Sequence, residues 1–513
     1  MKIEVSFLLL FSLLLASNFG ATTNCASLPT AKSEPAIVDS SQNVPPDVEQ
    51  RLRRIENGLL LPVMVKGQPS QPMKLAERMQ FYKTPGVNIA FINNGRIEWA
   101  RGYGVREAGK REQVTTETLF QAGSISKPVT AIAALRLVQA GKLNLDEDVN
   151  RKLVSWKVPE NEFTKEKKVT LRGLLSHSAG VNVSSFVGYL MNEQVPTLRQ
   201  ILDGEKPANT PPIRVEQVPG NGFRYSGGGY TIVQQILIDV EKKPFPDLMS
   251  ALVLKPLKMK HSTFEQQPLT KHLANLAAPG HNYNGETLAG KWRILPEMAA
   301  AGLWTTPSDL ARLVIEVQRA QAGRSDKFLS PATVNQMLTV QSGNWGLGFS
   351  VEGAGRTRRF SHGGSTLEIN SYLVAYTQTG QGAVIMTNSL RGERLISELL
   401  RSIAREYGWS DFQPKEKTIA KIDARVYADY IGQYQFEFSS DYVLTISTAG
   451  GNLITELKQP TSQSKAELYP ESETKFFRKD ADVEVSFVKD ESGRVTHLIF
   501  NQDGQELRAK RIK

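Results

Sequence analysis

The 513-residue chain has a single cysteine, Cys25, close to its start. One cysteine cannot form a disulfide within the chain, so the fold must be held together by its core. A cysteine that follows an apolar leader is a candidate site for lipid attachment. However, Thr22, Thr23 and Asn24 before it lack the Leu-small-small pattern of bacterial lipoprotein processing. We therefore expect Cys25 to be removed or inert.

Long apolar runs are also scarce. The run Val5–Ala16 is shorter than the ~20 residues that span a bilayer, and no later stretch approaches ~18 consecutive apolar residues. This run follows Lys2, so it predicts a secretory signal peptide over residues 1–26, with cleavage between Ala21 and Ser27. We expect an exported protein, periplasmic or secreted, whose mature chain has no transmembrane span.

The sequence lacks metal-binding and nucleic-acid-binding patterns as well. None of its six histidines stands in H-x-H or H-x-x-x-H spacing, so we expect no metal and no cofactor. Lys plus Arg number 62 against 52 Asp plus Glu, a net charge of +10. The basic residues are spread along the chain without an accompanying nucleic-acid motif, which argues against a nucleic-acid partner.

What is present is the composition of a globular protein, with 40% hydrophobic and 22% charged residues and enough length for two or three domains. Residues 27–71 are predicted to be a leader and linker, because Ala26–Pro46 is rich in Ser, Thr, Pro and Ala without periodicity. Then a short helix is predicted over Met73–Tyr82. Strands over Val87–Asn93 and Arg96–Tyr103 flank Asn94-Gly95, a strong hairpin signal.

The next segments predict one domain over residues 72–408. A long helix is expected from Ser124 to Ala140, the middle of the domain is helix and loop, and a helix is expected over Leu395–Tyr407. Strand patterns return at 347–351, 371–376 and 383–386. An opening hairpin and closing strands imply a sheet completed by both ends of the domain.

The remaining chain has a different texture. Residues 409–422 read as a linker, and residues 423–513 as an all-β sandwich or small barrel, because short alternating runs are separated by turn signals such as Gly450-Gly451. The predicted strands are Tyr442–Ser447, Asn452–Leu457, Val483–Val488, Val495–Phe500 and Leu507–Ile512.

The residues best suited to chemistry are Ser124 and Lys127 in the sequence Ser-Ile-Ser-Lys. Spacing of i to i+3 puts the hydroxyl and the amine on one helix face. Serine becomes a nucleophile when a base takes its proton, and lysine is such a base when burial lowers its pKa. The start of a helix also favours negative charge beside Ser124. Taken alone, the tetrapeptide fits a helix cap followed by a surface lysine better than a catalytic pair.

Two further motifs follow in order. With Ser124-x-x-Lys127, they make the chain resemble the serine β-lactamases and penicillin-binding proteins, in the branch of the class C β-lactamases and D-Ala-D-Ala carboxypeptidases. Tyr225-Ser226-Gly227 resembles the second motif, Tyr-x-Asn, and His362-Gly363-Gly364 resembles the third, Lys/His-x-Gly. The similarity covers about residues 72–408. It implies an α/β (α+β) fold, with an antiparallel sheet flanked by helices plus an all-helical subdomain, and the C-terminal strands resemble a lipocalin-like domain.

The resemblance implies a role for each matched residue. Ser124 attacks a carbonyl and becomes acylated, while Lys127 and Tyr225 share the proton transfer. The oxyanion hole is formed by the backbone N–H groups of Ser124 and Ser365. His362, Gly363, Gly364 and Ser365 contact the substrate, which is an ester, a D-amino-acid peptide or a β-lactam, a small molecule or peptidoglycan-like compound. The oligomeric state is left open.

Two positions depart from the family pattern. Gly227 stands where many relatives have Asn, and glycine has no amide with which to hold a substrate's acyl-amide group. His362 stands where most β-lactamases have Lys, so the site lacks a permanent positive charge at neutral pH. Both departures favour ester cleavage over β-lactam cleavage.

Three other candidates are weaker. We expect His177, in a loop ending at Gly180, to be structural. Trp304 and Trp345 fit the wall of an acyl pocket and a core position equally well.

Two alternative functions were weighed. An α/β-hydrolase requires G-x-S-x-G, and Ser176-His177-Ser178-Ala179-Gly180 fails at its first glycine. A non-catalytic β-lactamase-fold scaffold of the cell envelope, with the C-terminal domain doing the recognition, agrees with Gly227 but gives no reason to keep Ser124, Lys127 and Tyr225 together.

Overall fold

The structure is a computed structural model, which describes residues 45–513 except 70, 267, 268, 270, 327, 460, 461 and 503. The predicted signal peptide, Cys25 and the leader up to residue 44 lie outside the described residues. The described chain forms two compact units. The larger contains residues 45–54 and 74–400, and the smaller contains residues 55–73 and 401–513.

The larger unit is built on a six-stranded antiparallel sheet with the strand order β3-β2-β9-β8-β7-β6. Strands from the beginning of the unit pair with strands from its end, as in the register Ile89↔Ile385 between β2 and β9. The prediction of a sheet completed by both ends of the domain is therefore confirmed. The strands are β2 (Gly86–Asn93), β3 (Arg96–Gly104), β6 (Ser350–Glu352), β7 (Arg359–Ser365), β8 (Asn370–Tyr376) and β9 (Gly382–Thr387).

The predicted hairpin joins β2 to β3. Asn93 pairs with Arg96, so Asn94 and Gly95 form a two-residue connection. Both have positive φ angles, 51° and 69°, which a two-residue turn of this kind requires.

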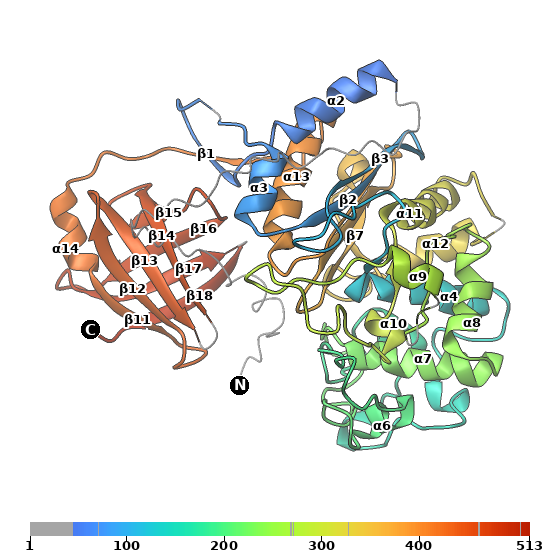
Figure 1. The fold of residues 1–513 in the computed structure, drawn as a ribbon. Coiled ribbons are helices and arrows are strands. Elements are labelled where there is room, and N and C mark those ends of the chain that lie inside the picture. The colour runs from blue at the N-terminus through green and yellow to red at the C-terminus, as the bar shows by residue number, and fades with distance from the viewer. Residues whose placement is uncertain are drawn as a thin grey trace. The chain divides into compact units, whose positions relative to one another are not determined.

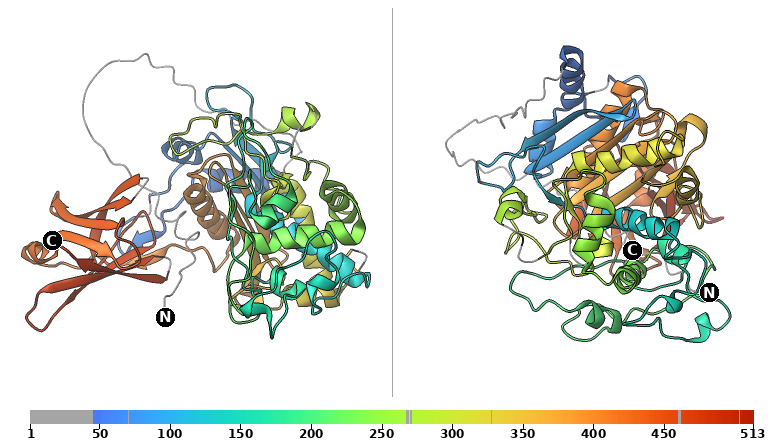
Figure 2. Two further views of the ribbon diagram at one scale, coloured as in Figure 1. Left: turned by 90° about the horizontal axis from the view of Figure 1, so that it is seen from below. Right: turned by 90° about the vertical axis from the view of Figure 1, so that its right-hand side faces the viewer.

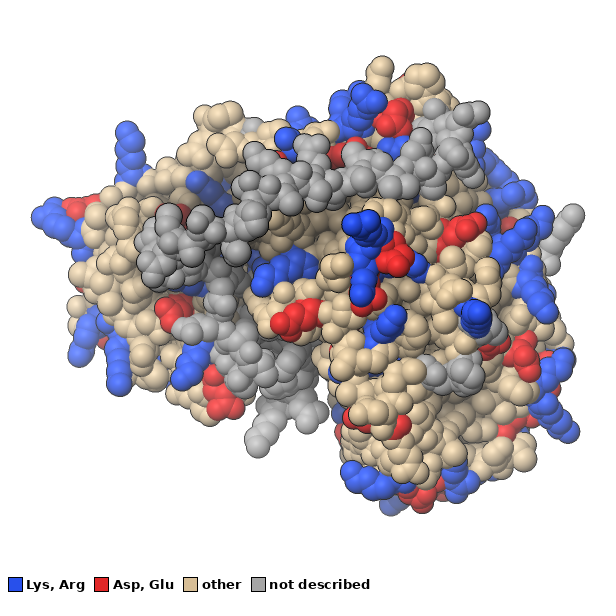
Figure 3. All heavy atoms as spheres, in the orientation of Figure 1, with Lys and Arg blue, Asp and Glu red and all other residues tan. Residues whose placement is uncertain are grey.

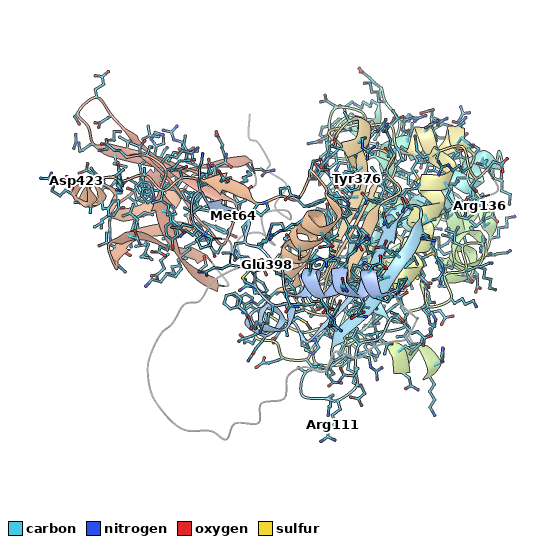
Figure 4. All side chains as sticks on the ribbon, turned by 90° about the horizontal axis from the view of Figure 1, so that it is seen from above. Met64, Arg111, Arg136, Tyr376, Glu398 and Asp423 are labelled. Atoms are coloured by element: carbon cyan, nitrogen blue, oxygen red, sulfur yellow. The ribbon has the colours of Figure 1, made fainter. Side chains whose placement is uncertain are left out.

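Helices cover both faces of this sheet (Figure 1). α11 (Pro307–Gln321) lies across one face, as the right-hand view of Figure 2 also shows, and its Gln318 side chain donates to the carbonyl oxygens of Tyr376 and Gln381 at 2.9 Å each. On the other face lie α3 (Leu75–Phe81) and α13 (Gly392–Tyr407). Arg78 of α3 donates to both carboxylate oxygens of Glu398 on α13, at 2.6 and 2.8 Å; Tyr376 and Glu398 are labelled in Figure 4.

The segment between β3 and β6 is mainly helical, as the resemblance implies. At its centre is α4, in which every residue from Ser126 to Leu135 is buried. Short two-stranded pairing of β4 (Phe120–Gln121) with β5 (Trp304–Thr305) fixes the chain just before α4. The helices are α4 (Ser126–Gln139), α5 (Leu171–Leu175), α6 (Leu198–Asp203), α7 (Gly227–Glu241), α8 (Phe245–Met249), α9 (Lys271–Leu276), α10 (Met298–Ala301) and α12 (Pro331–Met337).

Two elements lie where the sequence predicted only a leader and linker over residues 27–71. α2 (Pro46–Glu56) is an amphipathic helix whose Val48, Leu52 and Ile55 are buried. β1 (Val63–Val65) pairs in parallel with β10 (Lys415–Lys417), a strand from the predicted linker 409–422. The apolar spacing i, i+4, i+7 in α2 is the helical signal that the composition of the preceding residues obscured.

The smaller unit contains a closed eight-stranded antiparallel barrel, in which the first strand, β11, pairs with the last, β18. Its interior is filled by aromatic and aliphatic side chains, among them Tyr430, Tyr434, Phe476 and Phe487. The predicted small all-β barrel is confirmed. The strands are β11 (Gly432–Phe436), β12 (Val443–Ala449), β13 (Asn452–Gln459), β14 (Ser462–Pro470), β15 (Lys475–Phe477), β16 (Val483–Lys489), β17 (Val495–Gln502) and β18 (Gln505–Arg511); α14 (Tyr427–Tyr430) precedes them.

Charged side chains of both signs are interspersed on the face shown in Figure 3. Within the described residues, no helix is both long and apolar enough to cross a bilayer. The same residues contain no group of three or more His, Cys, Asp or Glu side chains placed to hold a metal ion.

Candidate active site

The hydroxyl of Ser124 and the amine of Lys127 are in direct contact. Ser124 lies in a short 3-10 turn, η1 (Gly123–Ile125), which leads into α4. The predicted helix from Ser124 to Ala140 therefore begins as a 3-10 turn and continues as an α-helix. The side chain of Lys127, one turn on, reaches back so that Nζ lies 2.8 Å from Ser124 Oγ.

Lys127 is buried, and none of its hydrogen-bond partners among the described residues is charged. Only 1% of the residue is exposed, and its Nζ also donates to the carbonyl oxygen of Ala300 at 3.0 Å. Neither the Ser124 hydroxyl nor the Ala300 carbonyl carries a charge that would stabilise the ammonium form. Burial therefore lowers the pKa of Lys127 from 10.5 to about 7, so a substantial fraction of the amine is neutral near pH 7.

Tyr225 completes a three-residue cluster with Ser124 and Lys127. Its side chain hydrogen-bonds to Ser124, and Lys127 Nζ lies 5.0 Å from the centroid of its ring. Burial raises the pKa of Tyr225 above 10, with a smaller opposing effect from the Ser124 hydrogen bond. Tyr225 is therefore a neutral phenol at neutral pH, able to donate a proton but not to remove one as a phenolate.

The end of β7 passes beside the turn that holds Ser124. A Cβ on Gly364 would collide with the carbonyl oxygen of Ala122, and the Ser371 hydroxyl donates to that oxygen at 3.0 Å. Gly123 has a φ of 53°, and a Cβ there would lie 2.8 Å from the backbone nitrogen of Ser365. Only glycine permits this approach, which brings the Ser365 amide next to the residue before Ser124.

His362, at the start of the third motif, has a buried ring. Its Nδ1 lies 2.6 Å from the carbonyl oxygen of Gly363, so this nitrogen carries the proton and donates it. Nε2 is then a bare acceptor; it is buried and has no hydrogen-bond partner among the described residues. Burial and the nearby charge of Lys127 lower the pKa of His362 to about 3, so the ring supplies no positive charge near pH 7.

The space beside Gly227 is tight. A Cβ on Gly227 would lie 3.0 Å from both Phe186 Cε2 and the Ser184 carbonyl oxygen, which also accepts the Gly227 N–H at 2.9 Å. The missing amide of the second motif is therefore accompanied by an apolar ring packed against the same backbone. Sequence reasoning identified Gly227 but gave no signal for Phe186, whose loop comes from about 40 residues earlier in the chain.

An aromatic cluster surrounds Tyr225. The ring centroids of His177 and Tyr225 are 4.3 Å apart. The ring centroid of Trp345 lies 5.6 Å from that of Tyr225 and 5.1 Å from that of His362. The sequence fitted a pocket wall and a core position equally well for both Trp304 and Trp345. In the structure Trp345 belongs to this aromatic cluster. Trp304 is a core residue, 1% exposed, whose ring packs edge-on against Trp292 with centroids 5.4 Å apart.

The comparisons with known proteins agree with this geometry. The Beta-lactamase family model matches residues 74–405, and a domain of unknown function, DUF3471, matches residues 416–511. A penicillin-binding protein of Bacillus subtilis (strain 168) is 22% identical over 467 residues, covering 86% of this chain and 97% of that protein. Protein flp of Staphylococcus aureus (strain MW2) is 28% identical over 228 residues, which are 44% of this chain and 42% of that protein. Teichoic acid D-alanine hydrolase of Staphylococcus aureus is 25% identical, covering 49% of this chain and 57% of that protein.

Solved structures show the same fold. The octameric penicillin-binding protein homologue from Pyrococcus abyssi has a TM-score of 0.55 at 21% identity and covers 85% of this chain and 98% of that one. D-amino acid amidase from Ochrobactrum anthropi SV3 has a TM-score of 0.55 at 19% identity and covers 70% of this chain and 99% of that one. The family model spans more than half of the sequence and contains the Ser124, Lys127 and Tyr225 cluster, so the chain belongs to the Beta-lactamase family.

Proposed function

We propose that this member of the β-lactamase-fold serine hydrolases is an exported enzyme that forms an acyl-enzyme on Ser124. The observation that carries the proposal is the 2.8 Å contact between Ser124 Oγ and the buried amine of Lys127. Export rests on the predicted signal peptide over residues 1–26. The test is the intact mass of the protein recovered outside the cytoplasm. A mass that still includes residues 1–26 would contradict cleavage between Ala21 and Ser27.

In the proposed acylation step, neutral Lys127 takes the hydroxyl proton as Ser124 Oγ bonds to the carbonyl carbon of the substrate. The carbonyl oxygen becomes an oxyanion, which the backbone N–H groups of Ser124 and Ser365 stabilise. The proton then passes through Tyr225 to the leaving group as the scissile bond breaks. Because burial raises its pKa, Tyr225 serves as a proton carrier, and the role of base belongs to Lys127.

Deacylation reverses the roles. A water molecule attacks the ester carbonyl of acyl-Ser124 and gives up a proton to neutral Lys127. The C–O bond to Ser124 breaks, Ser124 regains its proton, and the carboxylic acid leaves. Every proton taken up in the first half-reaction is thus returned in the cycle.

For the substrate, we propose an ester or amide of a D-amino acid, with esters cleaved faster than β-lactams. Gly227 has no side-chain amide and Phe186 packs close to its backbone, while neutral His362 gives no cation for the carboxylate of a penicillin or of a D-Ala-D-Ala terminus. Among similar proteins, one is a teichoic acid D-alanine hydrolase and another is a D-amino acid amidase. Both names agree with a substrate that needs no free carboxylate.

A substrate panel tests this ranking. We expect kcat/KM for a p-nitrophenyl ester to exceed that for nitrocefin and for an N-acyl-D-Ala-D-Ala peptide by about 10-fold or more, because a missing carboxylate partner and a lost amide contact each cost roughly 1 kcal/mol or more. The Ser124→Ala variant sets the background for each substrate. A faster rate on nitrocefin than on the ester would contradict the proposed substrate class.

The pH dependence tests the assignment of Lys127 as base. Its folded pKa is about 7, so the neutral form is lost as pH falls below that value. We expect kcat/KM to rise with pH through an apparent pKa near 7 and to stay level up to about pH 9, since the pKa of Tyr225 lies above 10.

A His362→Gln variant is the matched control for this profile. Because His362 is already neutral far above its pKa of about 3, we expect its replacement to leave the midpoint near pH 7 unchanged, whatever it does to the rate. A midpoint that disappears in His362→Gln would assign the titration to His362 and remove Lys127 from the role of base.

A further inference from the structure

We propose that His177 is a positioning residue for Tyr225, a role that rests on the proposed function of the site. The sequence predicted His177 to be structural. The structure places it in contact with both neighbours of Tyr225 in the chain and with the Tyr225 ring.

Two hydrogen bonds fix the backbone on either side of Tyr225. The N–H of Arg224 donates to the carbonyl oxygen of His177 at 2.7 Å, and the N–H of Ser226 donates to its Nδ1 at 3.1 Å. One residue therefore holds positions 224 and 226 at once. The Tyr225 side chain, which projects between these two anchors, has its direction set by them.

The imidazole ring also supports the phenol ring. The two ring centroids are 4.3 Å apart with an interplanar angle of 35°, and Trp345 lies edge-on to His177 at 5.0 Å. His177 is 2% exposed, so its own ring is held in place by the surrounding side chains. The Tyr225 hydroxyl must reach Ser124, and a displacement of about 1 Å in such a group costs on the order of 100-fold in rate.

The hydrogen bond from Ser226 determines the protonation of His177. Nδ1 accepts a hydrogen, so it cannot carry one, and the proton of the neutral ring is on Nε2. A doubly protonated ring would lose the anchor at Ser226. Burial, with a smaller effect of the nearby Lys127 amine, lowers the pKa of His177 well below 6.5 and keeps the accepting form.

The backbone of His177 limits which residues replace it. Its φ is 58°, in the left-handed region, where Asn is among the residues most readily accommodated. The Oδ1 atom of Asn also lies near the position of Nδ1 in histidine, whereas the amide of Gln lies near the position of Nε2. Replacing His177 with Asn therefore keeps an acceptor at the Nδ1 position, which Ser226 contacts, whereas replacing it with Gln places the polar group at the Nε2 position.

The experiment compares the variants His177→Asn, His177→Gln and His177→Ala on the ester substrate. We expect His177→Ala and His177→Gln to lower kcat about 100-fold with KM changed less than about 3-fold, and His177→Asn to recover at least 10-fold of that loss. Equal kcat values for the Asn and Gln variants would overturn the proposal, since the acceptor at Nδ1 would then be irrelevant.

A double-variant cycle with Tyr225→Phe distinguishes positioning of the Tyr225 hydroxyl from a purely structural role of His177. If His177 acts through the Tyr225 hydroxyl, replacing it by Gln adds less than about 3-fold to the loss already caused by Tyr225→Phe. Additive losses overturn the positioning role while leaving the proposed function intact. A wild-type enzyme that turns over none of the substrates overturns the proposed function and this role together.

Discussion

Replacing Ser124 with alanine is expected to lower turnover by about 10⁴-fold or more, the largest effect of any single change in this chain. The variant keeps the fold, because the half-buried hydroxyl bonds to Lys127 and Tyr225 and carries no part of the hydrophobic core. Without Oγ there is no atom to form the acyl-enzyme. The measurement is the steady-state rate on the p-nitrophenyl ester, together with covalent labelling by a fluorophosphonate or penicillin probe.

Ser126 provides the control within the same turn. Its hydroxyl donates to the Gly123 carbonyl at 2.7 Å and accepts from the Leu303 N–H at 2.9 Å, so it is directed into the core and away from Lys127. We expect Ser126→Ala to keep the label on Ser124, with a lower melting temperature. Mass spectrometry locates the adduct. A wild-type chain that stays unlabelled by both probes would favour the alternative of a non-catalytic scaffold.

The Lys127→Met variant is expected to lose about 1000-fold in turnover and to become more stable than the wild type at pH 6. Methionine matches the length of the lysine stem and brings no charge into a site where the described chain gives the amine only the Ser124 hydroxyl and the Ala300 carbonyl as partners. The pKa of Lys127 is about 7 in the folded protein and 10.5 in an unfolded chain. As pH falls from about 10.5 to 7, the unfolded chain takes up a proton that the folded protein does not, so the free energy of unfolding decreases. It is lowest below pH 7. The gain on removing the lysine is a few kcal/mol at pH 6.

The pH dependence of this gain in stability tests the lowered pKa of Lys127 most directly. We expect the difference in free energy of unfolding between Lys127→Met and the wild type to shrink steadily between pH 7 and pH 10. Lys127→Arg, which keeps a charge that cannot be removed, should be inactive and less stable at both ends. If Lys127→Met were destabilised by the same amount at pH 6 and pH 10, burial would not lower the pKa of the Lys127 amine.

Local patterns were sufficient to predict several elements. The hairpin of β2 and β3 follows from alternating apolar residues around Asn94-Gly95, and the pairing of Ser124 with Lys127 follows from helical spacing. Strands β12, β13, β16, β17 and β18 were predicted within a few residues, because each has an alternating pattern and a turn signal beside it.

Other strands of the barrel were beyond such patterns. β14 begins Ser-Gln-Ser-Lys-Ala-Glu, with little apolar alternation, and β15 has only 3 residues. These strands exist because their neighbours supply the hydrogen bonds, as in the pairing of Leu453 with Leu468 and of Phe476 with Val485. Pairing partners distant in sequence leave no local signature.

The site divides in the same way. The resemblance identified Tyr225 and Ser365. The structure brings both to the Ser124 turn, Tyr225 from the loop just before α7 and Ser365 from the end of β7. The packing of Phe186 on Gly227 and of His177 on Tyr225 joins loops that are far apart in sequence. Neither contact depends on a motif, so only the folded chain reveals them.

The closure of the C-terminal barrel limits how that unit meets other molecules. Since β11 is paired with both β12 and β18, the described ladder has no unpaired border along its first and last strands. An extended peptide therefore cannot add to the border of β11 or β18, and recognition by strand addition is excluded along these two strands. A molecule that contacts β11 or β18 must engage outward-facing side chains or the connecting turns, and the same closure prevents two copies of the unit from pairing along these strands.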